Sequence, residues 1–239
     1  ENYVLVFDLS ITFNFLKLGT GYFPFSWNND HQARIGLLNR KTNDGMINWF
    51  NIDPCYFFHT VNAYEDQQGN VIVDAMRYQK LFDGDRNGPF TEFPPMLTRW
   101  SLNLSTGNAS ELQLDDLPAE FPRMHPDLNG KFNRYGYSLG TGSGPKPDFG
   151  RVIKYDFAKN IHEVYELDKG REGAEPVFIP SENQKSEDEG YLMTYVYDKV
   201  SDKSNLVIFN AQNIKSGPIA QIKLPQRVPF GFHGSWVPA

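Results

Sequence analysis

Two histidines lie in apolar surroundings and are the side chains best suited to chemistry. His59 stands in the middle of the aromatic stretch 54–66, and His233 stands in a second one at 229–236. A buried imidazole needs a hydrogen-bond partner or a metal ion, because an unpaired buried polar group costs about 1–3 kcal/mol. A lone histidine on an apolar strand is more often a satisfied core residue than a ligand. Two such histidines raise the question of whether they meet at one site.

Two acidic residues make a shared metal site at these histidines more plausible. Glu120 and Glu175 are single carboxylates among apolar and proline neighbours. Metal-bound histidines usually donate their second ring N–H to a carboxylate or a carbonyl, which fixes the ring orientation. The alternative for each acid is a turn-capping or surface glutamate, and spacing alone leaves both interpretations open. The remaining histidines are expected to be solvated, structural or on the surface: His31, His125 and His162.

Composition favours a β-rich chain with a sizeable core. Of 239 residues, 40% are hydrophobic and 15% aromatic, and 16 prolines and 20 glycines imply many turns. The net charge of −6 and the absence of a basic run argue against nucleic acid as a partner. The single cysteine, Cys55, excludes an internal disulfide and fits a reducing compartment. No apolar run approaches the roughly 20 residues that span a bilayer.

The chain from residue 100 onward repeats itself. Strand–turn–strand patterns occupy residues 100–114, 152–167 and 206–224, and their turn residues Asn103, Asp156 and Asn210 lie 53 and 54 positions apart. A period near 50 residues built from short antiparallel strands is typical of β-propeller blades. A β-sandwich also repeats hairpins, but at shorter intervals.

Four such blades fit into this length, and an incomplete ring would leave strand edges exposed. The chain also opens on Glu1 rather than Met. We therefore expect a processed chain, an engineered fragment, or part of something longer.

Individual strands are expected from local pattern. Residues 3–7 form a short buried strand that 11–13 continue, and 19–29 form an aromatic loop over the core. A hairpin joins 34–38 to 47–52, and strands follow around His59 and at 71–76. Residues 79–96 read as a long loop.

The residues around His59 resemble a known family. Residues 53–65 are similar to the third-histidine motif of the carotenoid cleavage oxygenases, a group that includes lignostilbene dioxygenases and a retinoid isomerase branch. The match continues through residues 120–123, 134–137, 175–180, 187–192, 196–198 and 224–234. Order and spacing agree over nearly the whole chain.

The resemblance implies a seven-bladed β-propeller with Fe(II) on its axis, held by four histidines. It makes His59 and His233 the third and fourth ligands, and Glu120 and Glu175 the carboxylates that orient two ligand histidines. The first two ligands are absent, because the family's second one lies in a His-Asp-Phe segment ahead of the position matching Glu1. We therefore expect residues 1–239 to form one all-β propeller domain that lacks its N-terminal blades and two metal ligands.

The implied activity is that of a non-haem Fe(II) dioxygenase. Such an enzyme cleaves a carbon–carbon double bond of an apocarotenoid or stilbene-type substrate with O2 and releases two carbonyl products. Phe58 and Phe232 would line an apolar tunnel for the lipophilic alkene, or else pack between blades. An isomerase-hydrolase on the same scaffold and a non-catalytic binding propeller are the alternatives. The expected location is the cytoplasm, with peripheral contact to a membrane left open around residues 14–27, and the oligomeric state undetermined.

Overall fold

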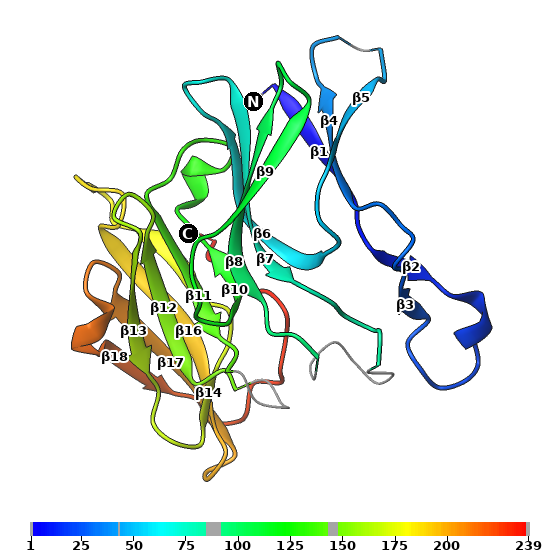
Figure 1. Cartoon of the computed structure of the whole chain (residues 1–239). Coiled ribbons are helices and arrows are strands. Elements are labelled where there is room, and N and C mark those ends of the chain that lie inside the picture. The colour runs from blue at the N-terminus through cyan, green and yellow to red at the C-terminus, as the bar shows by residue number, and fades with distance from the viewer. Residues whose placement is uncertain (1, 43, 85–91, 143–147, 238–239) are drawn as a thin grey trace. The chain divides into compact units, whose positions relative to one another are not determined.

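The structure is a computed structural model that describes residues 2–42, 44–84, 92–142 and 148–237 (Figure 1). These residues form β-strands and three short 3-10 helices, so the predicted all-β class is confirmed. The chain divides into two compact units, one built from residues up to Asp116 and one from Leu117 onward. Each is described by itself.

The first unit begins with a small antiparallel sheet of order β1-β4-β5, formed by Tyr3–Asp8, Arg34–Asn39 and Ile47–Asn51. A two-stranded ribbon pairs β2 (Ile11–Phe13) with β3 (Phe25–Trp27), and the 3-10 helix η1 (Phe15–Lys17) lies between them. The antiparallel pairing of β4 with β5 confirms the predicted hairpin at 34–38 and 47–52.

A four-stranded antiparallel meander completes this unit: β6 (Tyr56–Glu65), β7 (Asn70–Tyr78), β8 (Met96–Asn103) and β9 (Asn108–Gln113). Asp66 sets the turn between the first two strands, since its Oδ1 accepts from the backbone N–H of Gln68 at 2.9 Å and of Asn70 at 2.8 Å. Gly69 supplies the left-handed backbone of this turn at φ +81°.

The core of the first unit joins the β1-β4-β5 sheet to the meander. Ile35, Leu37 and Phe50 pack with Val73 and Trp100, and all five are at most 2% exposed. Burying side chains of this size contributes about 1.5–3 kcal/mol each. This cluster fixes β6, the strand that carries His59.

The second unit holds two further antiparallel sheets. One is a meander of β10 (Ala119–Arg123), β11 (Tyr135–Gly140), β12 (Arg151–Asp156) and β13 (Ile161–Glu166). The other has the order β14-β16-β17-β18, formed by Arg171–Gly173, Gly190–Asp198, Lys203–Asn210 and Pro218–Lys223, and β15 (Val177–Pro180) also pairs with β16. Short 3-10 helices follow β10 (η2, Pro126–Leu128) and β17 (η3, Ile214–Ser216).

Aromatic side chains hold these two sheets together. Tyr137 of β11 stacks on Phe178 of β15 with ring centres 5.4 Å apart and an interplanar angle of 7°. Leu139, Leu192 and Phe209 extend the same buried cluster. β15 contributes Phe178 to this cluster, and Glu175 lies two residues before β15 begins.

The sequence predictions hold for the three repeats, each of which is an antiparallel hairpin: β8–β9, β12–β13 and β17–β18. Two predictions need correction. Residues 3–7 form a strand, but Val4 and Phe7 are 45% and 37% exposed because β1 is an edge strand of its sheet. The expected loop at 19–29 contains β3, which pairs with β2 instead of letting it continue β1. Part of the predicted loop at 79–96 lies outside the described residues.

Candidate functional site

The stretch after β18 carries His233 and has no regular secondary structure. The backbone N–H of Val228 donates to Ser204 Oγ at 3.0 Å. The guanidinium of Arg227 lies 4.5 Å from the ring centre of Tyr197. Side chains of the second unit, rather than a strand ladder, therefore hold this stretch in place.

A hydrogen-bonded pair joins His233 to Glu175. His233 Nδ1 lies 3.0 Å from Glu175 Oε1, and the backbone N–H of Gly234 donates to Oε2 at 2.9 Å. The Glu175 side chain is only 4% exposed, whereas the imidazole is 55% exposed. Of the two neutral tautomers, a carboxylate at Nδ1 favours the one that donates from Nδ1 and leaves the lone pair on Nε2. That is the tautomer needed to bind a metal through Nε2.

Arg123 reaches the same place from β10. Its Nη2 donates to the carbonyl oxygen of Gly234 at 2.7 Å, and its Nε lies 3.7 Å from Glu175 Oε2. The buried carboxylate thus receives a cation and a backbone N–H beside the imidazole.

The end of β10 is bulged, and the bulge shapes this corner. The pairing with β11 shifts between Glu120 and Arg123. Phe121 within it has a left-handed backbone at φ +55°, a conformation that costs about 1–3 kcal/mol outside glycine. The Phe121 ring lies edge-on to His233, with centres 6.3 Å apart. Such bulges often re-aim side chains beside active sites.

Glu120 precedes the bulge and is buried, with 4% of the residue exposed. Its Oε2 accepts from the backbone N–H of Phe121 at 2.7 Å. The carboxylate is therefore inside the second unit rather than on its surface, which argues against the surface-glutamate interpretation.

His59 lies on β6 in the first unit and is half-buried. The β6–β7 register shifts twice around it, between Phe57 and Thr60 and again between Thr60 and Asn62. Phe58, beside His59, is 43% exposed and contacts Tyr78 edge-on at 5.5 Å. Both predicted site strands, β6 and β10, are thus irregular at the residues of interest.

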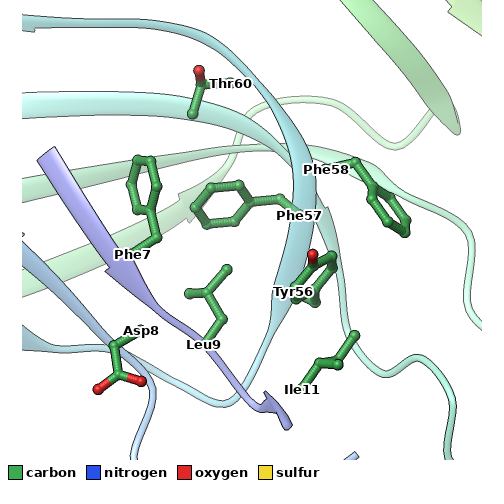
Figure 2. Close-up of a pocket in the computed structure, with 8 residues that line it drawn as sticks. All are labelled: Phe7, Asp8, Leu9, Ile11, Tyr56, Phe57, Phe58 and Thr60. Carbon is green, nitrogen blue, oxygen red and sulfur yellow. The ribbon is translucent and has the colours of Figure 1, made fainter. Parts of the chain in front are cut away.

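A pocket of about 410 Å³ opens beside β6 within the first unit (Figure 2). It is lined by Phe7, Asp8, Leu9, Ile11, Tyr56, Phe57, Phe58 and Thr60, and the surface that these residues present to it is more polar than apolar. Figure 2 shows Phe57 pointing toward Phe7, in edge-on contact at 4.8 Å, while Phe58 points to the other side of the strand.

Asp8 is the one carboxylate in that lining. Burial raises its pKa, but hydrogen bonds from Arg34 at 2.8 Å and His31 at 2.7 Å outweigh burial and hold the pKa below its ordinary value. Burial raises the pKa of Tyr56, so its phenol stays protonated at neutral pH. The pocket therefore presents a satisfied carboxylate and a neutral phenol to its occupant.

Comparison with known proteins identifies the family. The family model described as retinal pigment epithelial membrane protein matches residues 1–238. A carotenoid cleavage oxygenase of Mycobacterium tuberculosis is 36% identical over 223 residues, which cover 90% of this chain and 44% of that protein. The chain belongs to the carotenoid cleavage oxygenase family.

Two further proteins are similar to this chain in sequence or in structure. Carotenoid 9,10(9',10')-cleavage dioxygenase 1 of Pisum sativum is 31% identical, with 99% of this chain and 47% of that protein covered. The crystal structure of cobalt-substituted Synechocystis apocarotenoid oxygenase superposes with a TM-score of 0.89 at 26% identity, covering 100% of this chain and 51% of that one. The chain spans about half the length of the curated relatives it matches.

Among the residues predicted from the carotenoid cleavage oxygenase motifs, the structure brings His233 and Glu175 together. Glu120 lies in the same unit, and Phe232 lies next to His233 with 77% of its surface exposed. His59 and Phe58 belong to the first unit. That His59 and His233 share one metal stays a prediction. No group of three or more His, Cys, Asp or Glu side chains suited to a metal ion occurs within the described ranges.

Sequence reasoning missed one contact and misjudged one histidine. Arg123 ends the matched motif at 120–123, but no role was given to it. His31 was expected to be solvated, which is wrong, because it lies 2.7 Å from Asp8 and is 30% exposed. His125 is structural, as expected: its Nδ1 accepts from Asp127 N–H at 3.2 Å and caps η2. Within the described ranges, no helix has the length and hydropathy of a membrane span.

Proposed function

We propose that this chain is part of a non-haem Fe(II)-dependent dioxygenase that cleaves a carbon–carbon double bond of an apocarotenoid or stilbene-type substrate with O2. The products would be two carbonyl compounds. Family membership supports this reaction class, and the names of the relatives point to carotenoid substrates. The observation that carries the proposal is the His233–Glu175 hydrogen bond, because it prepares one imidazole for a metal.

His59 and His233 would supply two of four histidine ligands, and the other two would come from a part of the protein outside this sequence. Neutral imidazole suits Fe(II), and the tautomer favoured by Glu175 presents the Nε2 lone pair. Glu120 is buried, as an outer-shell carboxylate would be. Fe(II), when bound, would supply the activation of O2. The side chains of this chain would hold the metal, orient the imidazoles and exclude water.

The proposed scaffold is a single seven-bladed propeller domain to which residues 1–239 contribute about half. Two four-stranded meanders and a related sheet that includes β14 and β16–β18 support this, because each has the strand order of a propeller blade. The share of each relative that the chain covers, about half, is consistent with the proposal.

The alkene would bind in an apolar tunnel. Phe58, 43% exposed beside His59, is one proposed wall residue. Phe232 is the proposed counterpart beside His233. Binding of this kind positions the double bond and leaves activation of O2 to the metal.

Replacing His59 or His233 by alanine in the complete protein tests the proposal. Each variant should lose turnover and most of its bound iron, while His162→Ala, on β13, should keep both. Full iron content and turnover in both variants would refute the ligand assignment. Product analysis separates the reaction classes: paired aldehydes or ketones support cleavage, whereas an isomerised alcohol points to an isomerase-hydrolase. A protein without iron or O2 consumption would be a binding propeller.

We further propose a cytoplasmic enzyme that touches a membrane surface through the segment around η1. Its exposed apolar side chains are Phe13, Phe15, Leu16, Leu18, Tyr22, Phe23 and Phe25. Apolar side chains inserted among lipid headgroups gain burial there. Leu16→Glu should weaken flotation with liposomes, and Val200→Glu, at a site of matching exposure (91% against 90%), should not. Equal flotation of the two variants would refute the contact.

A further inference from the structure

We infer that Arg123 is a positioning residue that holds the segment around His233 in place against Glu175. This inference rests on the proposed metal-binding role of His233. Arg123 lies 111 residues from Gly234 in sequence, yet its Nη2 donates to the Gly234 carbonyl at 2.7 Å. Its Nε lies 3.7 Å from Glu175 Oε2. One guanidinium therefore contacts both the backbone next to the ligand and the carboxylate that orients it.

The peptide groups at Gly234 show what this contact does. The Gly234 N–H donates to Glu175 Oε2 and its carbonyl accepts from Arg123, so this residue is fixed on both sides. His233 is the preceding residue, and its Nδ1 reaches the other oxygen of Glu175. Because no strand ladder holds this stretch, the direction of the imidazole depends on these side-chain contacts.

The charge of Arg123 has a second effect. The Glu175 side chain is 4% exposed, and a buried carboxylate without a cation is strongly destabilised. With Arg123 beside it, the Glu175 carboxylate accepts from both the imidazole and the Gly234 N–H. Without it, the carboxylate would move toward solvent, and the imidazole would lose its fixed orientation.

The β10 bulge is the element that aims Arg123. One extra residue between Glu120 and Arg123 changes which way the following side chains point. Phe121 in the bulge keeps a left-handed backbone at φ +55°, and its ring lies against His233. The left-handed backbone at Phe121 thus accompanies a ring that lies against His233 and a guanidinium that contacts Gly234 and Glu175.

The test is titration of Co(II) into the metal-free complete protein, followed by its visible ligand-field spectrum. Arg123→Gln should weaken Co(II) binding by about 10-fold or more, within the roughly 10–100-fold range of outer-shell partners, and should change the spectrum. Arg123→Lys, which keeps the charge and one donor, should recover part of both. Arg151→Gln is the matched control, because Arg151 lies in the same sheet, is 34% exposed against 35%, and pairs with Glu166 at 2.8 Å.

A double-mutant cycle with Glu175→Gln decides whether Arg123 acts through Glu175. The double variant should bind Co(II) no more weakly than Glu175→Gln alone, because both changes remove the same arrangement. Additive losses, or an Arg123→Gln protein indistinguishable from Arg151→Gln, would overturn the inference. Should Arg123→Gln fail to fold, the Arg123→Lys protein carries the same comparison. His233→Ala keeps the two proposals apart: undiminished Co(II) binding there refutes the ligand role itself, whereas its loss beside a normal Arg123→Gln refutes only the positioning role.

Discussion

Replacing Lys154 by alanine removes the cation from a buried ion pair that ties the two sheets of the second unit together. Lys154 Nζ lies 2.6 Å from Asp188 Oδ2, and the two side chains are 5% and 10% exposed. The ammonium also donates to the Gln212 carbonyl at 3.2 Å and lies 4.6 Å from the Tyr135 ring centre. Lys154 belongs to β12, whereas Asp188 precedes β16, so the pair bridges sheets that share one core.

The expected loss follows from burial. Breaking a buried pair by removing one partner costs about 3–5 kcal/mol, because the remaining charge is left in a poorly solvated place. The relatives are about twice as long as this chain, and in a protein of that length 1 kcal/mol shifts the unfolding midpoint by only about 1 °C. Lys154→Ala should therefore lower the melting temperature of the complete protein by roughly 3–5 °C. Lys154→Met combined with Asp188→Leu removes both charges and should stay within about 1.5 kcal/mol of the parent, a loss comparable to one hydrogen bond.

Calorimetry of the complete protein measures these shifts, and hydrogen exchange of the β16 amides locates them. Lys199→Ala is the control, because Lys199 pairs with Glu172 at 2.5 Å but is 53% exposed. Its loss should stay below about 1 kcal/mol. A Lys154→Ala protein that melts like Lys199→Ala would show that Asp188 reaches solvent, and the reasoning from burial would be wrong.

Three further predictions concern a carboxylate, a thiol and a turn. The hydrogen bond from Arg134 holds the pKa of Asp156 below its ordinary 3.8, so this pair stabilises the fold above that pH and the gain disappears as pH falls through the lowered pKa; Asp156→Asn should flatten the acid limb of a urea-unfolding pH series. Burial raises the pKa of the Cys55 thiol to about 12, so iodoacetamide should modify it quickly only in denaturant, as mass spectrometry would show; rapid labelling of the native protein would contradict this. Asn160, left-handed at φ +52° in the β12–β13 turn, should tolerate glycine, whereas valine should cost about 1–2 kcal/mol in urea unfolding; equal stabilities of the two variants would refute the strain.

Local chemistry explains why the hairpins could be predicted. Asn103 accepts from Ser105 N–H and Thr106 N–H, and Asp156 accepts from Lys159 N–H, so these turn residues organise their own loops. The spacing of these turn residues in the sequence therefore corresponds to real turns between paired strands. The His233–Glu175 pair was within reach for another reason: both residues stand out as polar groups among apolar and proline neighbours.

Contacts between distant residues could not be predicted in the same way. Arg123 and Gly234 lie 111 positions apart, and Lys154 and Asp188 lie 34 apart. An arginine next to a proline on a short strand is compatible with many partners, since its side chain is long and flexible. Only the folded sheets select one of them.

The bulge in β10 did leave a signal in the sequence. Pro122 cannot donate to a strand ladder, so a proline inside a sheet is confined to an edge, to the first residue of a strand, or to a bulge. Pro122 is buried near the end of β10, and the register with β11 shifts across it. Glu120 and Arg123 flank the irregular step, so the same proline that interrupts the ladder separates the buried carboxylate from the guanidinium that reaches Gly234. The motif at 120–123 is therefore best understood as one structural device, in which each side chain depends on the bulge for its direction.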